Sequence, residues 1–524
     1  MQPPPRMAGV RFALLCVLIA VTCPAAETPQ TLFDVREYRV LGNTQLPVRE
    51  IETVLYPLLG DGKSLTDVEV ARAALEKTYH DHGFGTVFVD IVPGQDVSDG
   101  VVRLRATEGR LHETTISGAR YFPERDIAAA VPAAQAGTVP NLQALQDQIA
   151  AVNAQTADRS VVPILKAGPV PGTVDLSLKV NDHLPLHGSV ELNNAYSAET
   201  EPLRANLGLS YSNLFADLDT LAAQYQFSPQ RPGQVSVIAA NYLAHPIFGG
   251  LRLSASFIDS NSAVSTIGGL DVLGKGQIAG LRLAVPVQSN AATIQTLTLG
   301  LDYKHFRQTV NLGSGTALDT PISYVNLSLG YGGTWIAGPN HAVLNLSANF
   351  GPRGINANAD GFENDRYLAR PNYFYLRGDG SWVQSLPAQW QVLARVSGQW
   401  AREPLVSNED YSLTGFDGVR GYLEAEVLAD AAIRGTLQLQ SPPLKWRIDH
   451  LADAFVFFDA GHAYLLQPLP GEAGTFSASS YGAGFDLLPG HTVSGSLSWA
   501  MPLSSASNTE AHSSRLLFVV RGAF

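Results

Sequence analysis

The chain has 524 residues, enough for two to four ordinary domains. Hydrophobic residues make up 45% of it and charged residues only 16%, against about 25% in ordinary soluble domains, which excludes a disordered chain. The 47 acidic and 35 basic residues give a formal net charge of −12, which argues against nucleic acid as a partner. Beyond the N-terminal segment no run of about 18 apolar residues occurs, so a helical membrane protein is also excluded. A β-rich soluble protein or a membrane β-barrel remains.

Residues 1–26 are typical of a secretory signal peptide, because two arginines precede a short apolar stretch that ends in small residues. The alternative of a lipoprotein signal at Cys23 is disfavoured by Thr22, which stands where such signals usually carry Gly, Ala or Ser. Both cysteines, Cys16 and Cys23, fall within this segment. We therefore expect a mature chain without disulfides or thiol chemistry, exported to a bacterial envelope.

The next part of the chain, up to Asp182, repeats with a period of 76 residues. Seven positions carry identical or similar residues in the two copies: Val40, Gly42, Leu46, Pro47, Arg49, Glu50 and Ile51 recur as Ile116, Gly118, Phe122, Pro123, Arg125, Asp126 and Ile127. Proline followed by acidic residues predicts a helix start in each copy. The repeat therefore predicts two related domains, at residues 32–109 and 110–182.

Each copy reads as strand, helix, helix, strand, strand. The longer helix begins at Ser64 or Thr66 in the first copy and at Asn141 in the second, since these side chains can cap a helix N-terminus. Two strands then close each copy, at 86–92 with 101–106 and at 160–165 with 173–180. A three-stranded sheet with helices on one face leaves open edges, and an open edge can accept an extended peptide as an added strand. Purely structural domains are the alternative.

From about residue 187 to 524 the pattern changes to runs of roughly ten residues in which apolar and polar residues alternate. Sixteen runs start near His187, Leu203, Asp217, Gln234, Gly250, Gly274, Ala292, Thr320, Asn340, Pro371, Gln389, Glu424, Asp453, Ala478, His491 and Arg515. This pattern predicts an all-β transmembrane barrel of 16 antiparallel strands, with apolar residues toward lipid and a polar lumen. The clearest run is 424–440, with Val427 and Ala429 on its apolar face. A soluble β-sandwich or β-helix is the alternative.

Two short segments favour one kind of barrel. Residues 415–422 read Gly-Phe-Asp-Gly-Val-Arg-Gly-Tyr, in the longest gap between runs, and residues 457–461 read Phe-Phe-Asp-Ala-Gly, in the run after the next. With the repeat and the sixteen runs, they resemble the two-partner secretion transporters of the haemolysin secretion/activation type. These transporters belong to the superfamily of outer-membrane barrels that carry POTRA (polypeptide-transport-associated) domains. The terminal Phe524, on the predicted lipid face, resembles the recognition signal of outer-membrane barrels.

The resemblance implies specific roles for these residues. In that family the Val-Arg-Gly-Tyr loop folds back into the barrel, and its arginine contacts the aspartate of the strand motif. Carried over, the loop motif is Val419, Arg420, Gly421 and Tyr422, and the strand motif that faces it is Phe457, Asp459 and Gly461. An Arg–Asp pair suits this role because a guanidinium can bind a carboxylate with two parallel hydrogen bonds. Some members also carry an N-terminal plug helix, which we do not expect here because few residues separate the signal peptide from Leu32.

The resemblance further implies an outer-membrane translocator with its POTRA domains in the periplasm. Its partners would be a large, repetitive secreted protein, the outer-membrane lipid and, during biogenesis, the barrel-assembly machinery. The sequence predicts no nucleic acid partner, no catalytic site, no metal and no cofactor, since the fragments that suggest a phosphate loop, a zinc protease or a calcium loop each lack a required residue. A barrel-assembly insertase and a passive porin are the alternatives.

Overall fold

The computed structural model describes residues 31–524, except 199, 216–217, 248–249, 263, 268–269, 308, 312–316, 357, 448–449 and 491. The predicted signal peptide lies outside these residues. The described chain forms two compact units, one up to residue 119 together with 124–181, and one of residues 120–123 and 182–524. No helix in the described ranges is long and apolar enough to cross a membrane.

The first unit contains two α/β modules. The elements of the first module are β1 (Phe33–Val35), β2 (Glu37–Leu41), α1 (Val48–Leu55), the 3-10 turn η1 (Tyr56–Leu58), β3 (Gly60–Lys63), α2 (Leu65–Asp81), β4 (Val87–Ile91) and β5 (Val101–Glu108). Its main sheet has the order β2-β5-β4, with β2 parallel and β4 antiparallel to the central strand. The two outer strands, β2 and β4, are the edges of this sheet.

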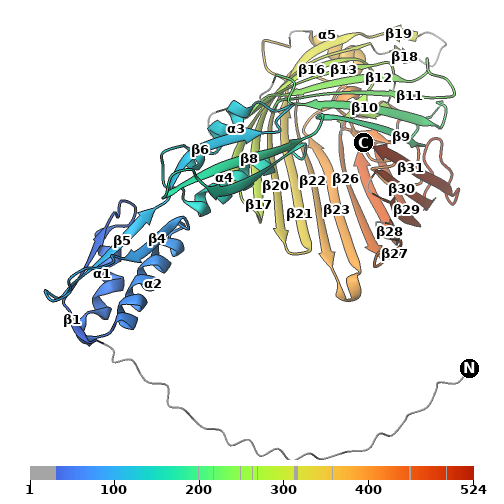
Figure 1. Ribbon diagram of the computed structural model, residues 1–524. Coiled ribbons are helices and arrows are strands. Elements are labelled where there is room, and N and C mark those ends of the chain that lie inside the picture. Colours follow the sequence, from blue (N-terminus) through green and yellow to red (C-terminus); the bar gives the residue numbers. More distant parts are fainter. Residues whose placement is uncertain are drawn as a thin grey trace, which may run out of the picture. The chain divides into compact units, whose positions relative to one another are not determined.

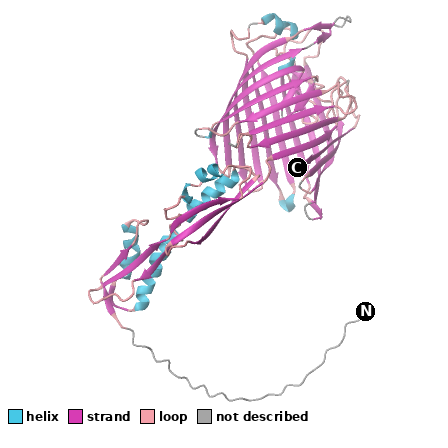
Figure 2. Ribbon diagram, turned by 45° about the horizontal axis from the view of Figure 1, so that its top comes forward, coloured by secondary structure: helices cyan, strands magenta, loops and turns pink. Residues whose placement is uncertain are grey.

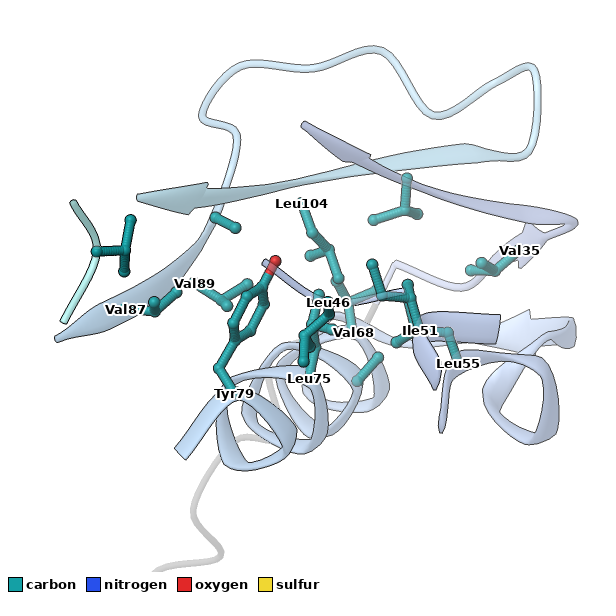
Figure 3. Close-up of a cluster of buried hydrophobic side chains, with 14 residues drawn as sticks. Val35, Leu46, Ile51, Leu55, Val68, Leu75, Tyr79, Val87, Val89 and Leu104 are labelled. Carbon is teal, nitrogen blue, oxygen red and sulfur yellow. The ribbon is translucent and has the colours of Figure 1, made fainter. Parts of the chain in front are cut away.

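Helix α2 packs one face against that sheet. Ser64, rather than Thr66, is its N-cap, and Ser64 and Asp67 form a reciprocal capping box in which each residue binds the other's backbone N–H. The buried face of α2 consists of Val68, Ala71, Leu75 and Tyr79, which recur at helical spacing. Figure 3 shows Val68, Leu75 and Tyr79 pointing toward Leu104, Val87 and Val89 of the sheet.

The second module repeats the arrangement. Its elements are β6 (Arg110–Ser117), α3 (Glu124–Ala130), the 3-10 turn η2 (Pro132–Ala134), α4 (Leu142–Ala154), β7 (Arg159–Ala167) and β8 (Thr173–Asp182). The sheet order is β6-β8-β7, so β6 and β7 are its edges. Asn141 caps α4 through the backbone N–H of Ala144, and Leu145, Ile149 and Val152 form the buried face of the helix.

The repeated glycines do the same work in both modules. Gly42 and Gly118 have positive φ angles of 83° and 90°, and a Cβ atom at either would lie 2.4 or 2.3 Å from the carbonyl oxygen of Ala106 or Val180. A carboxylate at the end of the central strand binds the following turn in each case. Glu108 accepts hydrogen bonds from the backbone of Thr44 and Gln45, and Asp182 accepts from residues 120, 121 and 122. The modules thus share a turn built from a glycine and a carboxylate.

The second unit is a closed antiparallel β-barrel, seen from two directions in Figures 1 and 2. Over the described residues it has sixteen strand positions, with β26 and the short β27 together forming one of them. The strands are β9 (Leu186–Asn193), β10 (Arg204–Ser212), β11 (Thr220–Phe227), β12 (Ser236–Leu243), β13 (Arg252–Ser260), β16 (Lys275–Ser289), β17 (Thr293–Arg307), β20 (Ile322–Ala337), β21 (Asn340–Phe350), β22 (Phe374–Ser385), β23 (Gln391–Ala401), β26 (Ala431–Gln440) with β27 (Leu444–Arg447), β28 (His450–Tyr464), β29 (Thr475–Pro489), β30 (Val493–Pro502) and β31 (Arg515–Ala523). Each predicted run corresponds to one position, so the 16-stranded fold is confirmed.

Alternation along the strands separates the two faces of the wall. On β17, Leu297, Leu299 and Leu301 are exposed on the outside, whereas Asp302 between the outward Leu301 and Tyr303 is buried inside. The same alternation gives β26 an outer face of Ile433, Leu437 and Leu439. The outer face can thus contact lipid, while charged side chains turn inward.

One strand was predicted too long. The alternation in 424–440 predicted a single strand, but β26 begins only at Ala431, and Val427 and Ala429 are buried within the preceding loop. Alternation alone cannot distinguish a barrel strand from a loop segment that is packed against other residues. Loops also carry short elements of their own: β14 (Val264–Ile267), β15 (Leu270–Leu273), β18 (Thr309–Asn311), β19 (Ala317–Asp319), α5 (Ala359–Asp365), the 3-10 turn η5 (Ser407–Glu409), β24 (Tyr411–Ser412) and β25 (Leu428–Ala429).

Candidate functional site

The long loop between β23 and β26, residues 402–430, folds into the barrel. Its side chains Leu413, Val419 and Tyr422 are almost completely buried, although they belong to a connection between strands. Arg420, at its tip, contacts residues of β26 and β28 whose sequence neighbours Leu437 and Phe458 are exposed on the outer face. Because successive strand residues point to opposite faces, these contacts lie on the lumen side. We call residues 402–430 the inner loop.

Arg420 and Asp459 form the central contact of the inner loop. The guanidinium donates from Nε to Asp459 Oδ2 at 2.7 Å and from Nη2 to Oδ1 at 2.9 Å, and the backbone N–H of Arg420 donates to the same carboxylate at 3.2 Å. Arg420 Nη1 also donates to Gln438 Oε1 of β26 at 3.2 Å. The Asp459 side chain is only 1% exposed, so the donors of Arg420 compensate for the water that its carboxylate has lost.

The ring of Phe457 lies against the guanidinium of Arg420. The guanidinium carbon lies 3.4 Å from the centre of the Phe457 ring, which is close enough for a cation–π contact. Phe457 and Asp459 are two residues apart on β28 and therefore face the lumen together. The strand motif thus supplies both a carboxylate for the edge of the guanidinium and a ring for its face.

Glycines of the inner loop and of the strand motif make room for the backbone and the Leu413 side chain of the loop. A Cβ atom at Gly461 would lie 2.6 Å from Leu413 of the inner loop, and a Cβ atom at Gly418 would lie 2.7 Å from the Leu413 carbonyl oxygen. Gly421 has a φ angle of 94°, which disfavours any residue with a side chain. Gly461 therefore belongs to the site because it admits Leu413 against the wall.

Val419 and Tyr422 fix the tip at other points. The Val419 backbone N–H donates to the Leu413 carbonyl at 3.0 Å, which folds the tip back on itself. The Tyr422 hydroxyl lies 2.7 Å from the carbonyl oxygen of Ser504, in the connection after β30, and 3.1 Å from that of Ser479 on β29. The structure therefore brings all four loop-motif residues and all three strand-motif residues into one region. Sequence reasoning missed Gln438 as a partner of Arg420, although it lay on the predicted polar face of its run.

Phe524 lies at the closure of the barrel. Strand β31 pairs with β9, and Phe524 exchanges two backbone hydrogen bonds with Gly188, of 3.0 and 3.1 Å. The Phe524 ring covers the glycine, since a Cβ atom at Gly188 would lie 2.3 Å from it. Phe524 is 75% exposed on the outer face, where lipid would contact it.

Comparison with known proteins gives the family. The family described as "Haemolysin secretion/activation protein ShlB/FhaC/HecB" matches residues 172–487, more than half of the chain, and the "POTRA domain, ShlB-type" matches residues 33–109. The chain belongs to this family. It is accordingly a member of the two-partner secretion transporters, with its barrel in the outer membrane and its POTRA domains in the periplasm.

Individual relatives and solved structures are similar to this chain over most of its length. The chain is 25% identical to the outer membrane transporter CdiB of Dickeya dadantii (strain 3937) over 448 residues, which cover 82% of this chain and 76% of the relative. It is 22% identical to CdiB of Escherichia coli O6:K15:H31 over 503 residues, covering 91% and 80%. Among solved structures, CdiB from Escherichia coli matches with a TM-score of 0.57 and 21% identity, covering 97% of this chain and 93% of that one. BamA from Haemophilus ducreyi lacking POTRA domains 1–3 matches with a TM-score of 0.60 and 14% identity, covering 94% and 100%.

Proposed function

We propose that residues 32–109 and 110–182 act as two POTRA domains that capture an unfolded exported protein in the periplasm by strand addition, and that the barrel lumen then passes it outward. The family assignment supports a translocator role, and relatives named as outer membrane transporters support it in kind. The predicted partner is a large, repetitive protein exported with this transporter. Outer-membrane lipid and, during biogenesis, the barrel-assembly machinery are further proposed partners.

A groove in the first module carries the capture proposal. It lies between strand β2 and helix α1 and has a volume of about 550 Å³. Apolar side chains line it from both elements, among them Tyr38 and Val40 of β2 and Val48 and Ile51 of α1, and Tyr56 of η1 completes it. Strand β2 is an edge of its sheet, so a segment lying in this groove would meet unpaired backbone groups on one side and apolar side chains on the other. An extended, partly apolar polypeptide has the matching chemistry.

The two edges of the second sheet differ in their suitability. Strand β7 contains Pro163, which has no N–H to donate, so a strand added there would lack one hydrogen bond. Strand β6, the counterpart of β2 in the repeat, contains no proline over Arg110–Ser117. The proposed sites of strand addition are therefore β2 and the part of β6 beyond Leu111, whose own backbone already exchanges hydrogen bonds with Gly137 and Thr138.

Two variants with a matched control test the capture proposal. Val48 on α1 is 66% exposed and lines the groove, whereas Val70 on α2 is 53% exposed and lies outside it. Since both valines are exposed on helices, aspartate at either should leave the fold intact. We expect Val48→Asp to reduce export of the partner severalfold and Val70→Asp to leave it unchanged. Equal export by both variants would argue against the groove as the capture site.

A deletion tests the role of the second module. Removal of residues 110–182 should abolish export of the partner while the barrel still reaches the outer membrane. Normal export by this variant would refute the capture role. The likeness to BamA concerns the fold, and an assembly insertase would give a different phenotype: its depletion would lower many outer-membrane proteins, whereas depletion of a partner-specific transporter lowers one exported protein.

A further inference from the structure

The inner loop is attached to the barrel wall at a second place, far in sequence from the Arg420 motif. Glu409 lies eleven residues before Arg420, in the short turn η5, and its side chain is 2% exposed. Such a buried carboxylate is stable only with donors around it. The lumen face of three strands provides them.

Three side chains converge on the Glu409 carboxylate. Lys304 Nζ of β17 lies 2.5 Å from Oε1, the Tyr324 hydroxyl of β20 donates to the same oxygen at 2.6 Å, and the Tyr375 hydroxyl of β22 donates to Oε2 at 2.7 Å. The ammonium group also lies 5.8 Å from the centre of the Tyr324 ring. Lys304 is only 13% exposed, so the ion pair is largely shielded from water on both sides.

The neighbouring residues of the loop are held by the same wall. Gln399 of β23 donates from Nε2 to the carbonyl oxygens of Glu409 at 2.9 Å and Asp430 at 3.1 Å, which joins the entering and leaving arms of the loop. The centre of the Tyr411 ring lies near two guanidiniums, 5.8 Å from that of Arg377 on β22 and 5.3 Å from that of Arg434 on β26. The segment 409–411 is therefore bound to the wall from β17 to β26.

Among the described residues, the Glu409 carboxylate shares no side-chain partner with Arg420 or Tyr422. The Glu409 carboxylate binds side chains of β17, β20 and β22, whereas the Arg420 and Tyr422 side chains bind β26, β28, β29 and the connection after β30. Because each attachment contributes separately to holding the loop, breaking one of them makes displacement of the loop easier while the other attachment remains. We propose that Glu409 is a positioning residue that holds the inner loop in the lumen independently of Arg420. This inference rests on the proposed function, in which the exported protein passes through the barrel lumen, where the inner loop lies.

The test measures channel opening of the full-length protein in planar lipid bilayers, together with export of the partner by cells. Glu409→Gln keeps the size of the side chain but leaves the Lys304 charge buried without its partner. We expect an increase on the order of tenfold in the time the channel spends open. Glu403→Gln is the matched control, because it removes the same charge from the same loop at a residue for which the described part of the chain shows no hydrogen bond or ion pair. It should behave as the parent.

A double variant that removes both charges distinguishes a role of Glu409 in holding the loop from a general loss of protein stability. Combining Lys304→Met with Glu409→Gln removes both charges and leaves the tyrosines to bind the glutamine, so we expect openings to return toward the parent level. The heat-dependent mobility of the barrel in gels shows whether Glu409→Gln protein is folded. If it is folded and its channel spends no more time open than that of the parent, the proposal is overturned. If Glu409→Gln does not fold, the double variant Tyr324→Phe, Tyr375→Phe takes its place. An unchanged open time of that variant would equally overturn the proposal.

Independence from Arg420 is tested by a double-variant cycle. The effects of Glu409→Gln and Arg420→Ala on the free energy of opening should add if the attachments are separate, and a strongly non-additive result would contradict this. Failure of the proposed function is distinguishable from failure of this inference. If no partner is exported even by the parent protein, the transport role is wrong. The time that the channel spends open still shows whether Glu409 holds the loop.

Discussion

The carboxylate of Asp459 receives three hydrogen bonds from a single residue, Arg420, two from its guanidinium and one from its backbone N–H. The side-chain bonds require a planar fork of donors, and the backbone bond requires the loop to approach β28 closely. The contact therefore depends both on the arginine side chain at position 420 and on the position of the inner loop.

Substitution at this pair should release the loop tip. Arg420→Ala leaves Asp459 buried without a cation, and we expect a loss of about 3–5 kcal/mol in the free energy of loop docking, with export strongly impaired. Arg420→Lys should recover little, because an ammonium cannot form the two parallel bonds or lie flat on Phe457. Protease cleavage within residues 415–422 of the folded protein measures release. Asp459→Ala should give a similar phenotype, and additive effects in the double variant would argue against a shared contact.

The repeated turn glycine should be intolerant of any side chain. Gly42→Ala places a Cβ atom 2.4 Å from the Ala106 carbonyl oxygen at a φ angle of 83°. We therefore expect the free energy of unfolding of the first module to fall by more than about 1 kcal/mol. Gly94→Ala is the control, since Gly94 also has a positive φ angle but no atom near its added methyl group. Limited proteolysis of the full-length protein compares the two variants. Equal resistance would show that the turn tolerates the methyl group.

Asp365 at the end of α5 should make the loop region sensitive to pH. Burial raises the pKa of its carboxyl from 3.8 to about 6, although Oδ2 accepts a hydrogen bond from the Ser407 backbone and Arg366 lies nearby. The folded protein thus binds this proton more tightly than the unfolded chain does. Stability from this group rises as the pH falls through about 6 and levels off below the unfolded pKa.

Asp365→Asn should remove this dependence. At pH 7.5 the aspartate is ionised at a cost of about 3 kcal/mol, so the asparagine variant should be more stable there, and the difference should shrink toward pH 4. The unfolding temperature measured across this range checks the expectation. A stability difference between the variant and the parent that grows on acidification would contradict it.

The closure of the barrel should depend on the fit between Gly188 and Phe524. A larger residue such as Leu at position 188 would collide with the Phe524 ring, so we expect Gly188→Leu to weaken the pairing of β9 with β31 and to lower the temperature at which the barrel unfolds in detergent. Phe524→Ala should lower the yield of folded barrel if this residue is a recognition signal. Gly188→Leu protein with parental unfolding would show that the ring can move aside.

Most of the fold could be predicted from the sequence because its signals are local. Alternation with period two marked every barrel strand, and Ser64 and Asn141 marked the starts of the long helices by their capping chemistry. The prediction was wrong at 424–430, where Val427 and Ala429 are buried together with other residues of the inner loop and with residues of the barrel wall. Local pattern holds no information about a loop that packs against distant strands.

The site was predictable only in part for the same reason. The Arg420 and Asp459 motifs were found through family resemblance, and the structure shows where their side chains lie. Glu409 has no comparable signal, since its donors Lys304, Tyr324 and Tyr375 are spread over three strands and more than seventy residues of sequence. Only the closed barrel brings those side chains to one point.

Cysteine cross-linking tests most directly whether the exported chain passes through this barrel. The chain from residue 31 onward contains no cysteine, so a single one can be placed at Ser256, which lines a lumen cavity, or at Phe257, which is 45% exposed on the outer face. A partner protein stalled during export should form a covalent adduct with cysteine at position 256 and none with cysteine at position 257. Adducts absent from position 256 while export proceeds would contradict the passage of the partner through the lumen.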